Sequence, residues 1–245
     1  MQEKIFVPSE AGSVCCFYDK IPSSSSVVII SHGYTSSKSS RTAIALSERL
    51  NDAGISTIRP DLYGHGESEG DITYLTIEKA VKNLVAVYDY VKSGYKKIAL
   101  VGSSFSWMVS LITATKRPLA TLVLKCPVFE YKKLFDDRLA KEGIEKWKKE
   151  KFIETFGKKV SFEAYENASG YDMKKIASAI KIPVLVIHGD RDTTVPIAQP
   201  ESLISLLKSE KEFVIIKGAD HFFYGANHFN KMIETSFVWL INHLK

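Results

Sequence analysis

The segment 97-KIALVGSSFSWMVSLITA-114 decides how this sequence is interpreted. An apolar, strand-like run at 98–101 leads into Ser104, and a segment with helical character follows. The spacing is close to G-x-S-x-G, in which a serine on a sharp strand-to-helix turn stands exposed above the edge of a sheet. Ser106 replaces the last glycine of that pattern, and Trp107 follows it. A serine in such a loop is often a simple turn residue, so the rest of the chain must decide whether Ser104 is a nucleophile.

Length and composition indicate one globular domain. A chain of 245 residues can bury a sizeable core, and a hydrophobic content of 45% with 25% charged residues is ordinary for such a domain. No apolar run reaches the roughly 18 residues of a membrane-spanning helix, and the N-terminal MQEKIFVPSE lacks the apolar stretch of a secretory signal. Cys15, Cys16 and Cys126 show neither metal-ligand spacing nor a disulfide pattern. We therefore expect a cytoplasmic protein without membrane insertion or a metal.

The net charge of +5 is unevenly distributed, and much of the excess lies between residues 132 and 181. A nucleic-acid-binding domain would carry a denser basic stripe with aromatic residues between the charges. The segment is more typical of the solvated surface of helices, so we expect no nucleic-acid partner.

Short apolar runs alternate with amphipathic segments along most of the chain. The predicted strands lie at 27–31, 55–59, 98–101, 119–125, 184–188 and 213–216, and the predicted helices at 41–53, 77–91, 105–115, 200–207 and 227–244. Continuous apolar strands between helices are typical of a parallel sheet covered on both faces. The sequence therefore predicts a doubly wound, mostly parallel α/β fold of three layers, with strands near 5–7 and 14–18 at an antiparallel edge.

One segment interrupts the alternation. No strand-like apolar run is found between Pro127 and Ile182, where a charged, helical stretch at 134–157 is followed by polar residues. We expect a core of residues 1–126 and 183–245, and a cap of residues 127–182 that covers the site as a lid. The alternative is a surface extension without a role. Seven aromatic residues of the cap could line an acyl pocket or simply bury the cap on the core: Phe129, Tyr131, Phe135, Trp147, Phe152, Phe162 and Tyr165.

Acyl transfer needs a nucleophile, a base held in one tautomer, and N–H donors aimed at the developing oxyanion. Ser104 is the candidate nucleophile, Asp192 in 188-HGDRDTTVP-196 the candidate acid, and His221 in 218-GADHFF-223 the candidate base. Each follows a predicted strand, in the chain order serine, acid, histidine. Parallel strands end at one edge of the sheet, so we expect these three side chains to meet there.

The oxyanion donors are expected from two loops. The residue after the nucleophile, Phe105, supplies one amide, and Tyr34 in the loop His32-Gly33-Tyr34 supplies the other. For the acid and the base the alternatives are Asp190, the more distant Glu130, and His228, which lies inside the last predicted helix and so has a surface or core role.

At this point the sequence resembles the α/β-hydrolase superfamily over essentially the whole chain. The resemblance is carried by 32-HGY, 61-DLYGHGESEGD, 102-GSSFS, 188-HGDRDTTVP and 220-DH. Gly64-His65-Gly66 with Ser68 is similar to the branch of monoacylglycerol lipases and bacterial carboxylesterases, and the short cap to the cinnamoyl and feruloyl esterases within it. The resemblance implies a serine hydrolase that needs no cofactor and acts on small-molecule carboxylic esters, with a structural role for His65.

The resemblance leaves several functions open. We expect a carboxylesterase for short-to-medium acyl or hydroxycinnamoyl esters, with an acyl thioesterase or a monoacylglycerol lipase-like hydrolase as alternatives. The family usually has Gly at position 106 and Gly or Ala at 107, so Ser106 and Trp107 are expected to strain the turn or reshape the pocket. That departure motivates an alternative of another class, a catalytically weak protein that binds a small apolar ligand under the cap. A haloalkane dehalogenase is disfavoured, because that chemistry places Asp where Ser104 stands.

Overall fold

The computed structural model describes residues 2–129, 131–155 and 157–245. Its main sheet has eight strands: β1 (Gln2–Val7), β2 (Val14–Asp19), β3 (Ser26–Ser31), β4 (Ser56–Pro60), β5 (Lys97–Ser103), β6 (Thr121–Lys125), β9 (Val184–Gly189) and β10 (Lys211–Ile216). They lie side by side in the order β1-β2-β4-β3-β5-β6-β9-β10. Pairing is antiparallel from β1 to β2 and from β2 to β4, and parallel between all later neighbours. The predicted antiparallel edge on a parallel sheet is confirmed.

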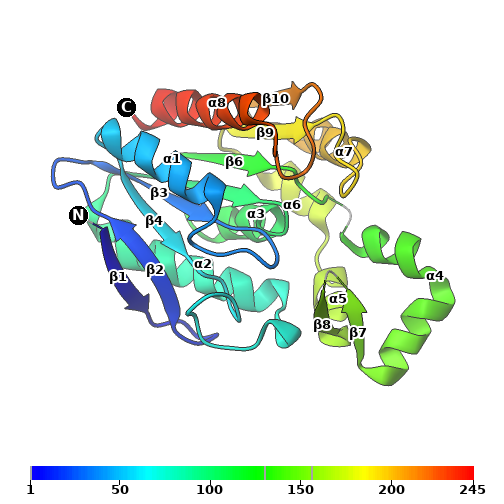
Figure 1. Ribbon diagram of the computed structural model, residues 1–245. Helices are drawn as coiled ribbons and strands as arrows, with labels where there is room; N and C mark the ends of the chain where they lie inside the picture. The colour runs from blue at the N-terminus through cyan, green and yellow to red at the C-terminus, as the bar shows by residue number, and fades with distance from the viewer. Residues whose placement is uncertain (1, 130, 156) are drawn as a thin grey trace.

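Helices cover both faces of this sheet (Figure 1). They are α1 (Arg41–Asp52), α2 (Ile77–Val91), α3 (Ser106–Lys116), α6 (Met173–Ala179), α7 (Ala198–Leu206) and α8 (Ala226–Leu244), with short 3-10 turns η1 (Ile72–Tyr74) and η2 (Lys92–Gly94). Side chains of α1 and α8 pack in one apolar cluster with one face of the sheet, and those of α2, α3, α6 and α7 pack in another with the opposite face. The predicted three-layer α/β fold is therefore confirmed.

The alternation of strand side chains explains the two clusters. In β5, Leu100 belongs to the cluster under α2 and α3, whereas Ala99 and Val101 belong to the cluster under α1 and α8. Successive residues of a strand point to opposite faces, so a strand buried on both sides must be apolar at every position. Local signals then start the helices: Ser40 accepts a hydrogen bond from the Ala43 amide at the beginning of α1.

The cap contains secondary structure that the sequence analysis did not predict. Its elements are α4 (Tyr131–Glu150), β7 (Phe152–Thr155), β8 (Lys158–Ser161) and α5 (Phe162–Ser169). The expectation of a segment without strands was wrong, because β7 and β8 pair as an antiparallel hairpin. The predicted helical stretch at 134–157 ends instead at Glu150, and it is interrupted at Ala140, whose φ is 53°. Short, lysine-rich strands carry too little apolar periodicity to be recognised from sequence.

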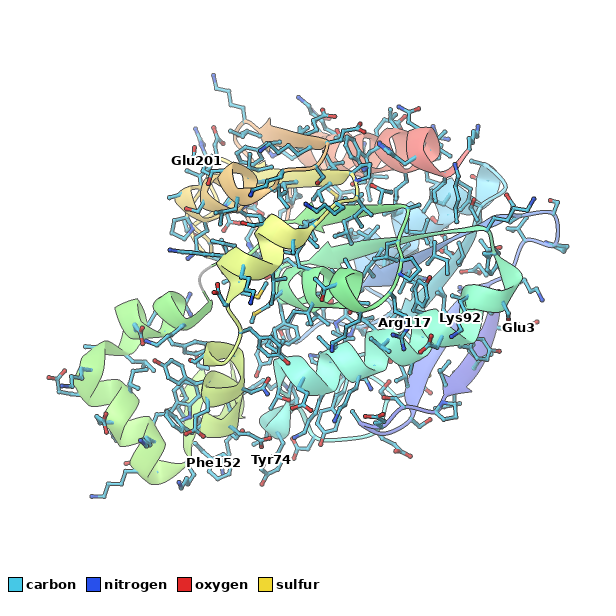
Figure 2. All side chains as sticks on the ribbon, turned by 180° about the vertical axis from the view of Figure 1, so that it is seen from behind. Glu3, Tyr74, Lys92, Arg117, Phe152 and Glu201 are labelled. Carbon is cyan, nitrogen blue, oxygen red and sulfur yellow. The ribbon has the colours of Figure 1, made fainter. Side chains whose placement is uncertain are left out.

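The cap elements form a small body beside the end of the sheet (Figure 1). Buried residues of α4, β8 and α5 make a third apolar cluster, which we call the cap cluster: Phe135, Trp147, Val160, Phe162, Ala164 and Tyr165. β8 lies against η1, and Phe152 of the neighbouring strand β7 meets Tyr74 of η1 edge to face, with ring centroids 5.9 Å apart (Figure 2). α6 packs with α3 and α7 in the main core, although the predicted cap extends to residue 182. The boundaries of the cap stay a prediction.

Among the described residues, no helix combines the length and the apolar character needed to cross a membrane. The cytoplasmic location stays a prediction.

Candidate active site

Ser104 lies in the sharp turn between β5 and α3. Its φ is 48°, in the left-handed region that side chains other than glycine rarely adopt. The Ser104 amide donates to the Lys125 carbonyl at 2.8 Å, and its own carbonyl accepts from the Trp107 amide at 3.0 Å, so the turn is fixed on both sides. A Cβ at Gly102 would approach Ser110 Oγ to 2.3 Å, which explains the glycine there. The turn lifts the Ser104 hydroxyl above the end of the strand.

The structure brings together the three side chains that the sequence analysis singled out. His221 Nε2 lies 3.1 Å from Ser104 Oγ, and His221 Nδ1 lies 2.6 Å from Asp192 Oδ2. Asp192 follows β9, and its other carboxylate oxygen accepts from the backbone amides of Thr194 and Val195 at 2.9 and 2.8 Å. With the His221 Nδ1–H donating to Asp192, Nε2 is left as the acceptor for the serine hydroxyl.

The electrostatics of Asp192 favour its charged form. Burial by itself would raise the pKa of this carboxyl group, but the hydrogen bond and the charge of His221, with the Val195 amide, hold it below the usual value. An ionised acid can orient the imidazole and stabilise its protonated form.

The loop after β3 lies directly beside the serine. A Cβ at Gly33 would be 3.3 Å from Ser104 Cβ, so only glycine lets the loop approach this closely without displacing its neighbour. This contact brings the Tyr34 end of the loop next to the turn that carries Phe105. In the described part of the chain the Phe105 amide has no hydrogen-bond acceptor, which suits a group that waits for a substrate oxygen.

Two buried histidines hold that loop from below. His32 Nε2 accepts from the Leu62 amide at 3.0 Å, and His65 Nε2 accepts from the Thr35 amide at 3.2 Å. Burial, with the neighbouring His65, lowers the pKa of His32 to about 4, and burial also lowers the pKa of His65. Both rings are therefore neutral at pH 7 and can accept these hydrogen bonds. His65 supports the loop after β3, which agrees with the structural role that the resemblance implied.

Ser106 and Trp107 do not disrupt the turn. The Ser106 hydroxyl donates to the His32 carbonyl and lies 2.9 Å from Ser31 Oγ, so it connects the first turn of α3 to the end of β3. Trp107 is fully buried beneath the turn, with its ring centroid 5.6 Å from that of Phe129. Ser106 therefore has hydrogen-bond partners at the turn, and Trp107 does not line the cavity described next. That the pair strains the turn stays a prediction.

A cavity of about 410 Å³ opens above Ser104 and His221. Ile72, Leu75 and Val128 form part of an apolar wall, which cap residues complete: Phe135, Val160 and Ala164. Of the seven cap aromatics named from the sequence, Phe135 lines the cavity, whereas Trp147, Phe162 and Tyr165 pack in the cap cluster. The Tyr131 side chain lies outside what the structure describes.

Asp190 and His228, named from the sequence as alternatives for the acid and the base, do not take part in the hydrogen-bond chain described above. Asp190 is exposed and accepts a hydrogen bond from the Gly218 amide at 2.5 Å, which fixes the turn after β10. His228 lies on α8 beside Gly225 and does not line the cavity. Glu130 lies outside the described residues.

Cys126, His188 and Asp192 are buried with their ligand atoms within 4.8 Å of one another. They fit a metal poorly. Burial raises the pKa of the Cys126 thiol to about 12, and the Asp192 carboxylate is already engaged with His221 and with the Thr194 and Val195 amides. His188 Nε2 donates to the Val195 carbonyl at 2.9 Å, which holds the loop that carries Asp192.

Sequence reasoning missed one charged residue of the site. Lys125 ends β6, is only 8% exposed, lines the cavity and donates from Nζ to the His221 carbonyl at 3.2 Å. A lysine at the end of an otherwise apolar strand was the available signal, because such a position meets the same sheet edge as Ser104.

The sheet order, the helices on both faces and the strand-to-helix serine turn define the α/β-hydrolase fold. Solved structures share it: Est1E from Butyrivibrio proteoclasticus with bound ferulic acid has a TM-score of 0.86 at 24% identity, over 98% of each chain. Alpha/beta hydrolase domain-containing protein 10 from mouse also has a TM-score of 0.86, at 21% identity over 99% of this chain and 100% of that one. At these identities the likeness establishes the fold alone.

Residues 22–169, more than half of the chain, match the family described as serine aminopeptidase, S33, and the chain belongs to that family. It is a serine hydrolase of the α/β-hydrolase class. The matched span contains Ser104 and the loop after β3, but it ends before Asp192 and His221. The chain is 24% identical over 221 residues to palmitoyl-protein thioesterase ABHD10, mitochondrial, of Bos taurus, which covers 83% of this chain and 69% of that protein. A carboxylesterase of Bacillus subtilis (strain 168) is 30% identical over 100 residues, 40% of either chain.

Proposed function

We propose that Ser104, His221 and Asp192 act as a catalytic triad and that the enzyme hydrolyses carboxylic esters through an acyl-enzyme on Ser104. The observation that carries this proposal is the continuous hydrogen-bond chain from Asp192 to His221 to Ser104, which ends at the floor of the cavity. The distances of 2.6 and 3.1 Å are within the range over which a base can accept a proton.

Acylation follows from this geometry. His221 Nε2 takes the proton of the Ser104 hydroxyl while Oγ attacks the carbonyl carbon of the ester. The negative charge that develops on the carbonyl oxygen is stabilised by the amides of Tyr34 and Phe105, the proposed oxyanion donors. The protonated His221 then gives its proton to the leaving oxygen, the bond from the carbonyl carbon to that oxygen breaks, and the alcohol departs.

Deacylation uses the same groups in reverse. His221 removes a proton from a water molecule, the resulting hydroxide attacks the acyl carbonyl, and the bond to Ser104 Oγ breaks. The proton returns to Ser104, and the carboxylic acid leaves. Throughout, the ionised Asp192 holds the imidazole in one orientation and stabilises its transient charge.

The cavity supports an apolar acyl group. Its wall of Ile72, Leu75, Val128 and cap side chains suits a short-to-medium aliphatic or a hydroxycinnamoyl chain, and its volume is in the range of small-molecule sites. The ferulic acid bound in Est1E supports the second of these. A thioester substrate is the alternative that a specific observation favours, because the relatives matched over most of this chain are named palmitoyl-protein thioesterases.

The first test is covalent labelling. We would incubate the protein with a fluorophosphonate and determine the intact mass, with Ser104→Ala as the control. One adduct on the wild type and none on the variant is the expected result. Absence of an adduct on correctly folded protein would contradict the proposal and favour the alternative of a small-ligand binding protein on this fold.

The second test separates the substrate classes. We would compare kcat/KM for an ester, a thioester and an amide that share one butanoyl group. We expect the ester or the thioester to exceed the amide by at least about a hundredfold. A preference for the amide would overturn the esterase proposal while leaving the triad in place.

A further inference from the structure

The charged residues that line the cavity within the described part of the chain are all cations. Among the described residues around it there are two cations, Arg41 and Lys125, and no aspartate or glutamate. Asp192 lies behind His221 and does not line it. A cavity with cationic walls and no carboxylate attracts anions.

Of the two cations, Lys125 gives the stronger support for an anion-binding cavity. In the described part of the chain its ammonium has one hydrogen-bond acceptor, the His221 carbonyl at 3.2 Å, and lies 5.3 Å from the ring centroid of Phe223. None of the described ion pairs includes it. An ammonium has three donors, and burying a charge without a partner is costly. Apart from the bond to the His221 carbonyl, the ammonium of this residue, which is 8% exposed and lines the cavity, has donors without a described acceptor.

Lys38 is a second buried lysine in this structure, and its partners can be compared with those of Lys125. The residue is 4% exposed, against 8% for Lys125, and its Nζ lies 2.5 Å from Asp61 and 2.9 Å from Glu67. Lys38, which does not line the cavity, has two carboxylate partners. Lys125, which lines it, forms no ion pair with a carboxylate among the described residues, so its ammonium can accept an anionic partner from outside the chain.

Arg41 adds a second cation on the same side of the sheet. Its guanidinium lies 3.6 Å from the ring centroid of Phe229, and Phe229 and Phe223 belong to one apolar cluster. Stacking uses the face of the guanidinium and leaves the N–H donors at its edge available. No described ion pair involves Arg41.

The mechanism assigns this side of the cavity to the leaving group. His221 must deliver a proton to the leaving oxygen, so that part of the substrate lies beside His221. Lys125 is bonded to the His221 backbone, and the exposed rings of Phe222 and Tyr224 follow His221 in the chain and line the same opening. The apolar wall of η1 and the cap is then left for the acyl chain.

We propose that the preferred substrates are esters or thioesters whose leaving group carries a carboxylate or a phosphate, bound by Lys125 and Arg41. The proposal rests on the function proposed above and specifies the substrate class of the same site. Arginine and lysine on carboxylate or phosphate oxygens form short, charge-assisted hydrogen bonds, which supply a preference that an uncharged leaving group cannot have.

The test uses two matched substrate pairs. The first is the butanoyl ester of 3-hydroxybenzoic acid against that of 3-hydroxybenzamide, which differ in one charge at nearly constant shape. The second is the butanoyl thioester of 4′-phosphopantetheine against that of pantetheine. For each pair we would measure the ratio of kcat/KM, anionic over neutral. We expect a ratio of about 10 or more in at least one pair, and the pair that shows it identifies the anion.

The variants locate the effect. Lys125→Met and Arg41→Met should each reduce that ratio to about 3 or less, and the double variant to about 1. Arg49→Met is the matched control, because Arg49 also lies over a ring, that of Phe237, but does not line the cavity. It should leave the ratio unchanged. If Lys125→Met folds poorly by circular dichroism, Arg41→Met and protection of Ser104 from fluorophosphonate by 3-hydroxybenzoate, relative to 3-hydroxybenzamide, carry the test.

The outcomes separate this inference from the proposed function. Hydrolysis of both neutral substrates with ratios near 1, or a high ratio that survives in both variants, overturns the anionic leaving group and leaves the esterase standing. Absence of turnover together with absence of a fluorophosphonate adduct overturns the proposed function, and this inference falls with it.

Discussion

The loop after β3 and the cap both border the cavity above Ser104, but they are held by different interactions. The loop is tied to the core through directed polar contacts: the Leu62 amide to His32, the Thr35 amide to His65, and Lys38 to Asp61. The cap is stabilised internally, mainly by ring packing in the cap cluster, to which the Trp147 indole adds one hydrogen bond to the Val160 carbonyl at 3.2 Å.

This difference indicates which of the two regions tolerates amino-acid substitutions. Directed contacts between buried groups lose their full value when one partner is removed, so they fix the position of the loop. Packed rings of similar volume can replace one another at a small cost. We therefore expect changes in the loop to alter folding and turnover, and changes in the cap to alter substrate binding.

The largest effect on stability is expected from breaking the buried ion pair between Lys38, in the loop after β3, and Asp61. Lys38→Met leaves the fully buried Asp61 without its main cation, and breaking such a pair costs about 3–5 kcal/mol of unfolding free energy. Urea unfolding would measure it. Lys4→Met is the control, because Lys4 bonds the same Glu67 at the surface and its loss should lower the unfolding free energy far less than the loss of Lys38. Equal losses in the two variants would contradict a rigid loop.

The second prediction concerns pH. His32 has a pKa of about 4 when folded and about 6.5 when unfolded, so between these values the unfolded chain binds the extra proton. The unfolding free energy therefore decreases by about 3 kcal/mol as the pH falls from about 6.5 to 4, and this contribution is constant above that window. The check is urea unfolding at several pH values. His32→Gln should flatten the slope, and His228→Gln should not.

The third prediction tests the cap. Trp147→Ala removes the fully buried ring at the centre of the cap cluster. Because that cluster is separate from the two main clusters, the global unfolding free energy should change by less than about 1 kcal/mol, while KM for a butanoyl ester rises about tenfold. Trp147→Phe should keep KM within about twofold. A global loss as large as that of Lys38→Met would show that cap and core unfold together.

The smallest expected effect is at Ser106. Ser106→Ala removes the hydroxyl that donates to the His32 carbonyl, and a lost hydrogen bond of about 1 kcal/mol predicts a kcat about fivefold lower at unchanged KM. Steady-state kinetics measure both. Ser110→Ala is the matched control on the same helix, since its hydroxyl bonds only the Ser106 carbonyl among the described residues. A rise in KM with unchanged kcat would exclude a role of Ser106 in positioning the loop after β3.

Most of the fold could be predicted because each central strand is buried on both faces. Such a strand must be apolar throughout, and runs such as 98–101 and 184–188 are therefore visible in the sequence. The β7–β8 hairpin was missed because its four-residue strands include Lys158, Lys159 and Glu154 and owe their pairing to the cap around them. The interruption at Ala140 has no glycine or proline to announce it.

The candidate triad could be predicted because parallel strands bring their ends to one edge. Ser104, Asp192 and His221 come within hydrogen-bond distance, and their catalytic role stays a proposal. Two features depend on three-dimensional neighbours and could not be read along the chain. The Ser106 hydroxyl donates to the His32 carbonyl, just after β3. Lys125 has no carboxylate partner among the described residues.

The backbone of Ser104 has one more consequence. A φ of 48° costs a residue with a side chain roughly 1 kcal/mol relative to glycine. A library selected for heat resistance alone would therefore enrich Gly at position 104, and, with Ser104 as the proposed nucleophile, its most stable members would be inactive. Directed evolution of this hydrolase therefore needs a selection for turnover in every round, because at this position the residue that favours thermal stability is not the one that the proposed catalysis requires.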